Sequence, residues 1–166
     1  MTMLGIRFDL RVPPFADLTH AEQYAACLDM CAWADDRGFD IVVLSEHHGV
    51  EDGFMSAPVT LAAAIAGRTK RISINIAAAL VPLHDPIRLA EQLATVALVS
   101  GGRLSLVAGL GYRPEEFAMA AVDKGEQLHA RRAADLEQRV ERGADGAAGV
   151  EDVVYQHDVH AGDVER

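Results

Sequence analysis

The sequence predicts an α/β protein with a parallel sheet, built from four consecutive strand–helix units. Apolar runs typical of strands begin near residues 4, 41, 72 and 104, at regular intervals. A stretch with the apolar spacing of a helix separates each run from the next. Parallel neighbours require such a crossover, which is almost always right-handed. Local periodicity leaves a closed barrel and an open, flavodoxin-like sheet as alternatives.

The first unit begins with a half-buried strand. Residues 4–10 alternate apolar and polar side chains, which is the period of a strand with one covered face. Thr19 and Glu22 then stand at the spacing of a capping box, so we expect a helix over residues 20–37. Gly38 is suited to end that helix, because glycine readily adopts the left-handed conformation of a helix end.

The second and third units are more apolar. Residues 41–44 (IVVL) are β-branched or leucine, which predicts a strand buried on both faces. Pro58 opens the helix that follows, since proline suits the first helical turn. Residues 72–81 predict a third strand, also buried on both sides, and Asp85-Pro86 predicts the start of the third helix.

The fourth unit is followed by a change in composition. Residues 104–108 predict a short strand, and residues 114–117 a helical turn. We therefore place one domain over residues 1–142 and an irregular, acidic and mobile tail over residues 143–166. Val153–Tyr155 is the one stretch of that tail with the composition of a strand.

The composition of the chain argues against several classes of binding partner. The chain has 166 residues, half of them hydrophobic, which predicts one globular domain. Its net charge of −10 argues against nucleic acid and against an anionic membrane surface as partners. We find no secretory leader and no long apolar span, so we expect a cytoplasmic protein that acts on a small molecule.

Polar or glycine-rich clusters gather where the strands end. They comprise Asp9 after the first strand, residues 45–48 after the second, residues 75–79 within the third, and residues 109–113 after the fourth. The carboxyl ends of parallel strands share one edge, so these clusters predict a common pocket. Asp9 and His48 are expected to line its substrate side.

His47 is the expected proton-transfer residue of this pocket. Imidazole exchanges protons near neutral pH, and the adjacent Glu46 could hold the ring in a fixed orientation. A histidine that only caps the loop is the alternative.

The glycine pair in the last cluster predicts close approach of a ligand to the backbone. Gly109 and Gly111 form a GxG, but the third glycine of a dinucleotide motif is replaced by Pro114. A flat or phosphorylated ligand could still approach such glycines closely. Arg113 could bind a phosphate or merely begin a helix. The small side chains that follow Asn75 leave room either for a ring system or for a tightly packed helix.

Other catalytic signatures are absent from the sequence. It contains no GxSxG, GxxxxGK[ST], HExxH or CxxC, so neither hydrolase, kinase nor zinc chemistry is indicated. Cys27 and Cys31 lie four apart on a helical pattern, which favours two buried thiols. His157 and His160 of the tail are expected to be solvated, and we expect no metal site.

Two stretches of the sequence resemble a known family. AWADDRGFDIVVLSEHHG and VPLHDPIRLAEQLATVALVSGGRLSLVAGLGYRPEEF resemble the bacterial-luciferase-like monooxygenases, which are flavin- or deazaflavin-dependent oxidoreductases with a TIM-barrel fold. The resemblance covers roughly residues 4–140. It implies a partial TIM (β/α)8 barrel, the amino-terminal half of that fold.

The resemblance also implies roles for individual residues. It makes His47 the active-site histidine and Glu46 its acidic neighbour. It places a non-prolyl cis peptide at Ile76-Ala77, behind the flavin ring, and puts three further residues beside the cofactor: Gly109, Gly111 and Tyr112. Leu110 stands where some members have an arginine that helps to hold the flavin phosphate. FMN is the cofactor that the resemblance implies. The absence of that arginine weakens the FMN assignment and keeps the deazaflavin coenzyme F-420 as the alternative.

Length is the main departure from the family. A complete TIM barrel needs about 250 residues and eight strands, whereas this chain has 166 residues. A half-barrel leaves open strand edges, for which three explanations stand as alternatives: a second copy that pairs with the first, another chain that completes the barrel, or a truncated or frame-shifted remnant. The implied activity is oxidation of a small organic substrate by reduced flavin and oxygen. The alternatives are deazaflavin-dependent hydride transfer and a truncated fragment that is non-catalytic or needs a partner.

Overall fold

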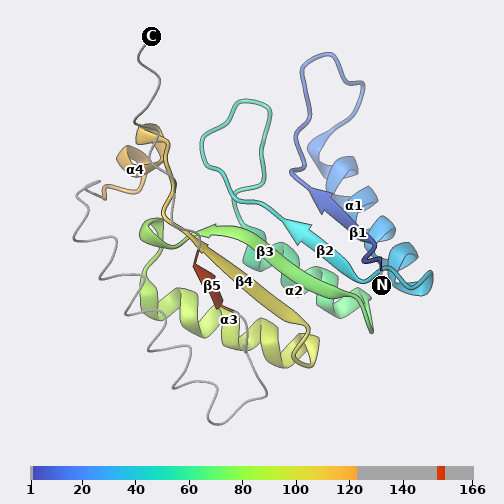
Figure 1. The fold of residues 1–166 in the computed structure, drawn as a ribbon. Coiled ribbons are helices and arrows are strands. Elements are labelled where there is room, and N and C mark those ends of the chain that lie inside the picture. Colours follow the sequence, from blue (N-terminus) through green and yellow to red (C-terminus); the bar gives the residue numbers. More distant parts are fainter. Residues whose placement is uncertain (1, 123–152, 156–166) are drawn as a thin grey trace.

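The strands form one parallel sheet in the order of the sequence (Figure 1). The computed structural model describes residues 2–122 and 153–155. Its strands are β1 (Gly5–Phe8), β2 (Ile41–Leu44), β3 (Ser73–Leu80), β4 (Leu104–Gly109) and β5 (Val153–Tyr155). Each strand pairs in parallel with the next, beginning with Gly5 beside Ile41 and Ile41 beside Ser73.

This sequential order decides between the two sheets that periodicity left open. A doubly wound open sheet reverses direction at a switch point and carries helices on both faces. Here the winding never reverses, and Figure 1 shows α1 (His20–Asp36), α2 (Pro58–Arg68) and α3 (Pro86–Ser100) on the same face of the sheet. The predicted α/β fold with parallel strands is confirmed, and its winding is that of a barrel.

The helices begin where the sequence predicts. The Thr19 side chain accepts from the Glu22 amide, and Glu22 in turn accepts from the Thr19 amide, which completes the capping box of α1. Asp85 caps α3 by accepting from the Arg88 amide at 2.9 Å. A short 3-10 helix, η1 (Val81–Leu83), follows β3, and α4 (Pro114–Met119) follows the loop after β4.

The hydrophobic core lies between the sheet and α1–α3. Alternate residues of β2, β3 and β4 are buried against these helices: Val42, Leu44, Ile74, Ile76, Leu104 and Leu106. The prediction that β2 and β3 are buried on both faces is wrong for the part of the chain that the structure describes. Ile41, Val43 and Asn75 point the other way and are only half-buried, because no described helix covers that face.

Part of the carboxyl-terminal segment that was expected to be irregular forms a fifth strand of the sheet. Val153–Tyr155 pairs in parallel with β4, with Leu106 opposite Val153 and Ala108 opposite Tyr155. The stretch expected to have strand composition is thus a sheet strand. The other residues of the expected tail, 143–152 and 156–166, lie outside the described residues.

Buried charges stabilise the amino-terminal edge of the sheet. The Asp35 carboxylate accepts from the backbone amides of Lys70, Arg71 and Ile72 at 2.6, 2.9 and 2.7 Å. The Arg103 guanidinium donates to the Thr69 hydroxyl and to neighbouring backbone carbonyls. These groups are satisfied by the chain itself, so this edge is structural. Among the described residues no helix has the length and apolar character to cross a bilayer.

Candidate active site

A cavity of about 610 Å³ opens at the carboxyl ends of β1–β4. It is lined by Arg7, Ser45, Glu46, His47, Phe54, Ala77, Ala78, Leu80, Val107, Gly109, Leu110, Gly111 and Tyr112. Six of the residues predicted for the site therefore share one cavity: Glu46, His47, Ala77, Gly109, Gly111 and Tyr112. Parallel strands that end at one edge bring them together, although they are far apart in sequence.

His47 lies in an aromatic corner of this cavity. Its ring meets Phe54 edge-on with centroids 4.7 Å apart, and Tyr112 at 5.8 Å. Its backbone amide donates to the Met55 carbonyl at 3.0 Å, which fixes the start of the loop. Its Nδ1 lies 2.9 Å from Oε1 of Glu116. Since a carboxylate accepts, the neutral ring carries its proton on Nδ1, which leaves Nε2 available for proton transfer.

Glu116, which the sequence did not reveal as a site residue, is the partner of His47. It lies in the first turn of α4, which begins at Pro114, and is 1% exposed. Its Oε1 also accepts from the His48 amide at 2.9 Å. Its Oε2 is buried without a hydrogen-bond partner among the described residues. Glu115 and Glu116 stand together where acidic residues favour any helix start, so no local signal separated the two.

Glu46 pairs with histidines other than the one expected. Its Oε1 lies 2.9 Å from Nε2 of His48 and 2.6 Å from Nε2 of His84, and its Oε2 accepts from the Leu80 amide at 2.7 Å. The expected pairing of Glu46 with His47 does not form, because consecutive side chains leave the loop in different directions.

Burial and hydrogen bonding have opposite effects on the pKa of the Glu46 carboxylate. Burial by itself would raise the pKa of Glu46, but the hydrogen bonds from His48, His84 and the Leu80 amide outweigh it and lower that pKa to about 2. The hydrogen bond to Glu46 likewise raises the pKa of His48 above its ordinary value, against partial burial, which lowers it. Glu46 is therefore a charged group inside the wall of the cavity.

Small residues form the opposite wall. The cis peptide bond joins Ala77 and Ala78, one residue later than the resemblance implied. A Cβ added to Gly109 would lie 2.8 Å from the Ala78 Cβ, so β3 and β4 approach closely here. Gly111 has a φ of +77°, a backbone conformation that favours glycine. Ala77, Ala78, Gly109 and Gly111 therefore contribute only backbone and methyl groups to this part of the lining.

Five predicted residues do not line the cavity. The Ile76 side chain is buried in the core on the helical side of the sheet. Asn75 donates to the Ser105 hydroxyl at 2.7 Å, across to β4. Asp9 is exposed and accepts from the Arg11 amide at 3.2 Å. Arg113 lies 3.4 Å from Glu116 Oε1, and the His48 ring is turned onto Glu46.

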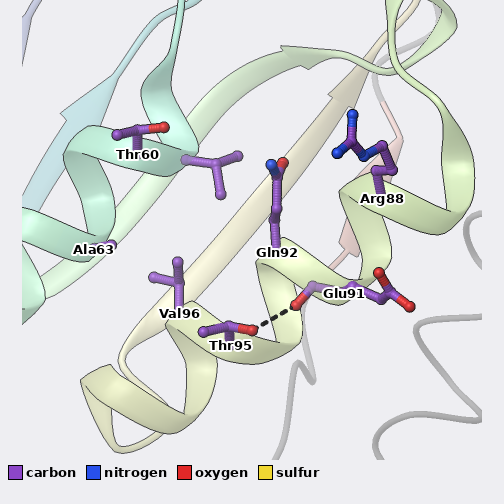
Figure 2. A pocket seen from close by; sticks show the side chains of 8 residues that line it. Thr60, Ala63, Arg88, Glu91, Gln92, Thr95 and Val96 are labelled. Atoms are coloured by element: carbon purple, nitrogen blue, oxygen red, sulfur yellow. Dashed lines mark hydrogen bonds between the residues drawn. The ribbon is translucent and has the colours of Figure 1, made fainter.

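A second hollow, of about 420 Å³, lies between α2 and α3 (Figure 2). Its lining residues are Val59, Thr60, Ala63, Arg88, Glu91, Gln92, Thr95 and Val96. The Thr95 hydroxyl donates to the Glu91 carbonyl at 2.8 Å, within the helix. None of the predicted site residues lines this hollow, and it holds no imidazole or thiol. The cavity at the strand ends is therefore the candidate active site.

The family model for luciferase-like monooxygenases matches residues 7–156. The chain belongs to the luciferase-like monooxygenase family. Its parallel strands and outer helices are accordingly part of the TIM barrel that this family shares, and the match includes β5.

Individual relatives agree with this assignment. The chain is 35% identical over 85 residues to the alkanal monooxygenase beta chain of Photobacterium leiognathi. The matched segment covers 51% of this chain and 26% of that protein. Monooxygenase RslO1 from Streptomyces bottropensis superposes with a TM-score of 0.70 and 30% identity, over 96% of this chain and 46% of that one.

A second solved structure contains a flavin. The oxygenating constituent of 3,6-diketocamphane monooxygenase from Pseudomonas putida, solved in complex with FMN, superposes with a TM-score of 0.72. It is 24% identical and covers 82% of this chain and 38% of that one, so it shows the shared fold. This luciferase-like chain thus spans less than half the length of these solved relatives.

Proposed function

We propose that this chain forms the flavin-binding and proton-transferring part of a luciferase-like oxidoreductase. The cavity at the ends of β1–β4 would take the ring system of a reduced flavin, with FMN as the favoured cofactor and a deazaflavin as the alternative. A small organic substrate would bind against the same ring. The observation that carries the proposal is the hydrogen bond between His47 and Glu116 beside a cavity that is also lined by the small residues Ala77, Ala78, Gly109 and Gly111.

The residues present fit a planar ring. Ala77, Ala78, Gly109 and Gly111 line the cavity without long side chains, so a ring could lie against their backbone. Among the described residues that line the cavity, Arg7 is the one lysine or arginine, and it donates to the Ser45 hydroxyl at 2.9 Å. Arg113, expected to bind a phosphate, is held by Glu116 instead. The described residues therefore suit the ring better than the phosphate.

His47 would move the proton of the reaction. With Nδ1–H donated to Glu116, the Nε2 lone pair can take a proton from a group bound in the cavity and return it later. Phe54 and Tyr112 contact the His47 ring edge-on, and with a ligand bound they would help to exclude water from that nitrogen. When bound, a reduced flavin would supply oxygen activation, and a deazaflavin would supply hydride transfer without oxygen.

The barrel of the family uses eight strands, and the described residues supply five of them. We expect turnover to need the remaining strands, contributed by a second copy or by another chain. Ring binding is expected to be measurable on this chain alone, because the wall and the histidine both lie within residues 2–122.

Cofactor titration tests the proposal. Purified protein is titrated with FMN and, separately, with the deazaflavin coenzyme, and quenching of cofactor fluorescence is followed. We expect one of the two cofactors to show saturable quenching when it binds the native protein. The Gly109→Val protein should quench that cofactor less, because the added side chain would occupy space beside the cavity. Gly67→Ala is the matched control, because a Cβ there meets nothing within 4 Å. Absence of quenching with both cofactors would overturn the proposal.

Oxygen uptake then separates the two chemistries. Consumption of oxygen during oxidation of the reduced cofactor supports monooxygenase chemistry, and oxidation without uptake supports hydride transfer. Saturable quenching without turnover, even after the barrel is completed, would indicate the non-catalytic, partner-dependent alternative.

A further inference from the structure

We propose that Glu46, His48 and His84 form a binding site for a divalent transition-metal ion, for which Zn²⁺ is the best match. One carboxylate oxygen and two imidazole nitrogens of these residues all lie within 4.8 Å of one another. No metal site was expected from the sequence, because the three residues follow none of the spacings of known metal motifs. Only the fold brings His84 beside the other two.

The two histidines converge on one buried oxygen. Nε2 of His48 lies 2.9 Å, and Nε2 of His84 2.6 Å, from Oε1 of Glu46. His48 comes from the loop after β2, whereas His84 directly follows η1. Two imidazoles from separate segments and one carboxylate thus place three donor atoms close enough together to bind one ion.

This donor set matches the preferences of zinc. Zn²⁺ binds imidazole nitrogen and carboxylate oxygen at about 2.0–2.2 Å, and open sites use three protein ligands with water in the fourth position. To bind, each Nε2 must present its lone pair, so the ion would replace the protons that now lie between the nitrogens and Glu46. The two imidazole side chains are 26% and 25% exposed, which leaves the ion a path from solvent.

A second layer of contacts supports the carboxylate. The Leu80 amide donates to Oε2 of Glu46 at 2.7 Å and fixes the orientation of the group. The Glu46 side chain is itself fully buried. Outer contacts of this kind orient metal ligands and hold them ready for an ion.

The proposed ion is distinct from the proton-transfer site. His47 is bound to Glu116, and neither His48 nor His84 lines the cavity, so only Glu46 is common to both sites. The ion would lie behind the cavity wall and tie the loop that carries His47 to the segment after β3. Its role would be to position that loop.

Zinc titration tests the proposal on the full chain with the tail histidines replaced, His157→Ala and His160→Ala. After treatment with a chelator, the protein competes for Zn²⁺ with a chromophoric chelator. We expect one ion per chain. His84→Gln should weaken binding by more than the roughly 10- to 100-fold that loss of an outer contact causes.

Glutamine is chosen because its amide can still donate to Glu46 where Nε2 did, so the hydrogen bond is kept while the ligand is lost. His20→Gln, on an exposed histidine at the start of α1, should leave zinc affinity unchanged. No binding at micromolar zinc, or equal affinity in the His84→Gln protein, would overturn the proposal. If that variant fails to fold, zinc-edge X-ray absorption of the parent protein decides: two imidazole ligands support the site, and fewer exclude it.

Discussion

Glu116 Oε1 lies 2.9 Å from Nδ1 of His47, although the two residues are 69 positions apart. This contact joins the loop after β2 to the first turn of α4. It determines which nitrogen of the imidazole carries the proton. Because both residues stand at the carboxyl edge of the sheet, the geometry of the parallel sheet produces the pair.

The first prediction concerns the tautomer of His47. Glu116→Gln replaces an acceptor-only carboxylate with an amide that can also donate, so Nδ1–H is no longer enforced. We expect long-range ¹H–¹⁵N correlation spectra to show the Nδ1–H form in the native protein and a mixture in the variant. Turnover in the completed enzyme should fall by about 100-fold. Glu115→Gln, on an exposed neighbour, is the control, and an unchanged tautomer in Glu116→Gln would contradict the assignment.

The second prediction concerns the cavity wall. Gly109→Ala places a Cβ 2.8 Å from that of Ala78, so the strands must shift apart. We expect destabilisation of about 1–3 kcal/mol, typical of overpacking, together with weaker flavin quenching. Gly67→Ala in α2 should instead stabilise the protein by about 0.5–1 kcal/mol, since its Cβ meets no neighbour. Urea unfolding measures both, and equal midpoints for the two variants would be inconsistent with a tight wall.

The third prediction concerns acid stability. The pKa of Glu46 falls from an ordinary 4.5 to about 2 in the folded protein. Its contribution to stability is therefore fully present above pH 4.5 and is lost as the pH falls towards 2. We expect about 3 kcal/mol of unfolding free energy to disappear over this range. Glu46→Gln should lack that part of the pH dependence, and identical slopes for the two proteins would refute the attribution.

The fourth prediction concerns His48, whose pKa is raised above 6.5 by the hydrogen bond to Glu46. A raised folded pKa contributes stability that is present below pH 6.5 and is lost as the pH rises through the folded value. An NMR titration of the His48 ring should give a midpoint above 6.5 in the native protein and a lower one in Glu46→Gln. A midpoint that does not move would show that Glu46 is not the cause.

The fifth prediction separates the structural edge of the sheet from the functional edge. In the native protein both carboxylate oxygens of Asp35 accept from three backbone amides. Asp35→Asn removes the negative charge and replaces one acceptor oxygen by an NH2 group, which cannot accept. We expect a loss of about 3 kcal/mol in unfolding free energy, whereas the exposed Asp36→Asn should change it little. Flavin affinity of the folded Asp35→Asn protein should match the native value. A selective loss of affinity would show that the two edges are coupled.

Several elements of the fold could be predicted because their signals are local. The capping box of Thr19 and Glu22 and the proline that opens α2 act within one helical turn, and the structure contains both. The common cavity of His47 and Gly109 followed from one general property, the shared edge of parallel strands. The half-buried second face of β2 was missed, because an apolar strand has the same sequence whether or not a helix covers that face.

The sequence by itself determined the order of strands and helices and the edge of the sheet where the candidate site residues gather, and it led to the proposal of His47 as the proton-transferring imidazole of that site. Only the tertiary structure decided the partners of the ionisable groups: Glu116 for His47, and Glu46 for both His48 and His84. The reason is physical. Secondary structure follows from contacts a few residues apart, whereas these pairs join segments whose separation in space depends on the register and packing of the whole sheet.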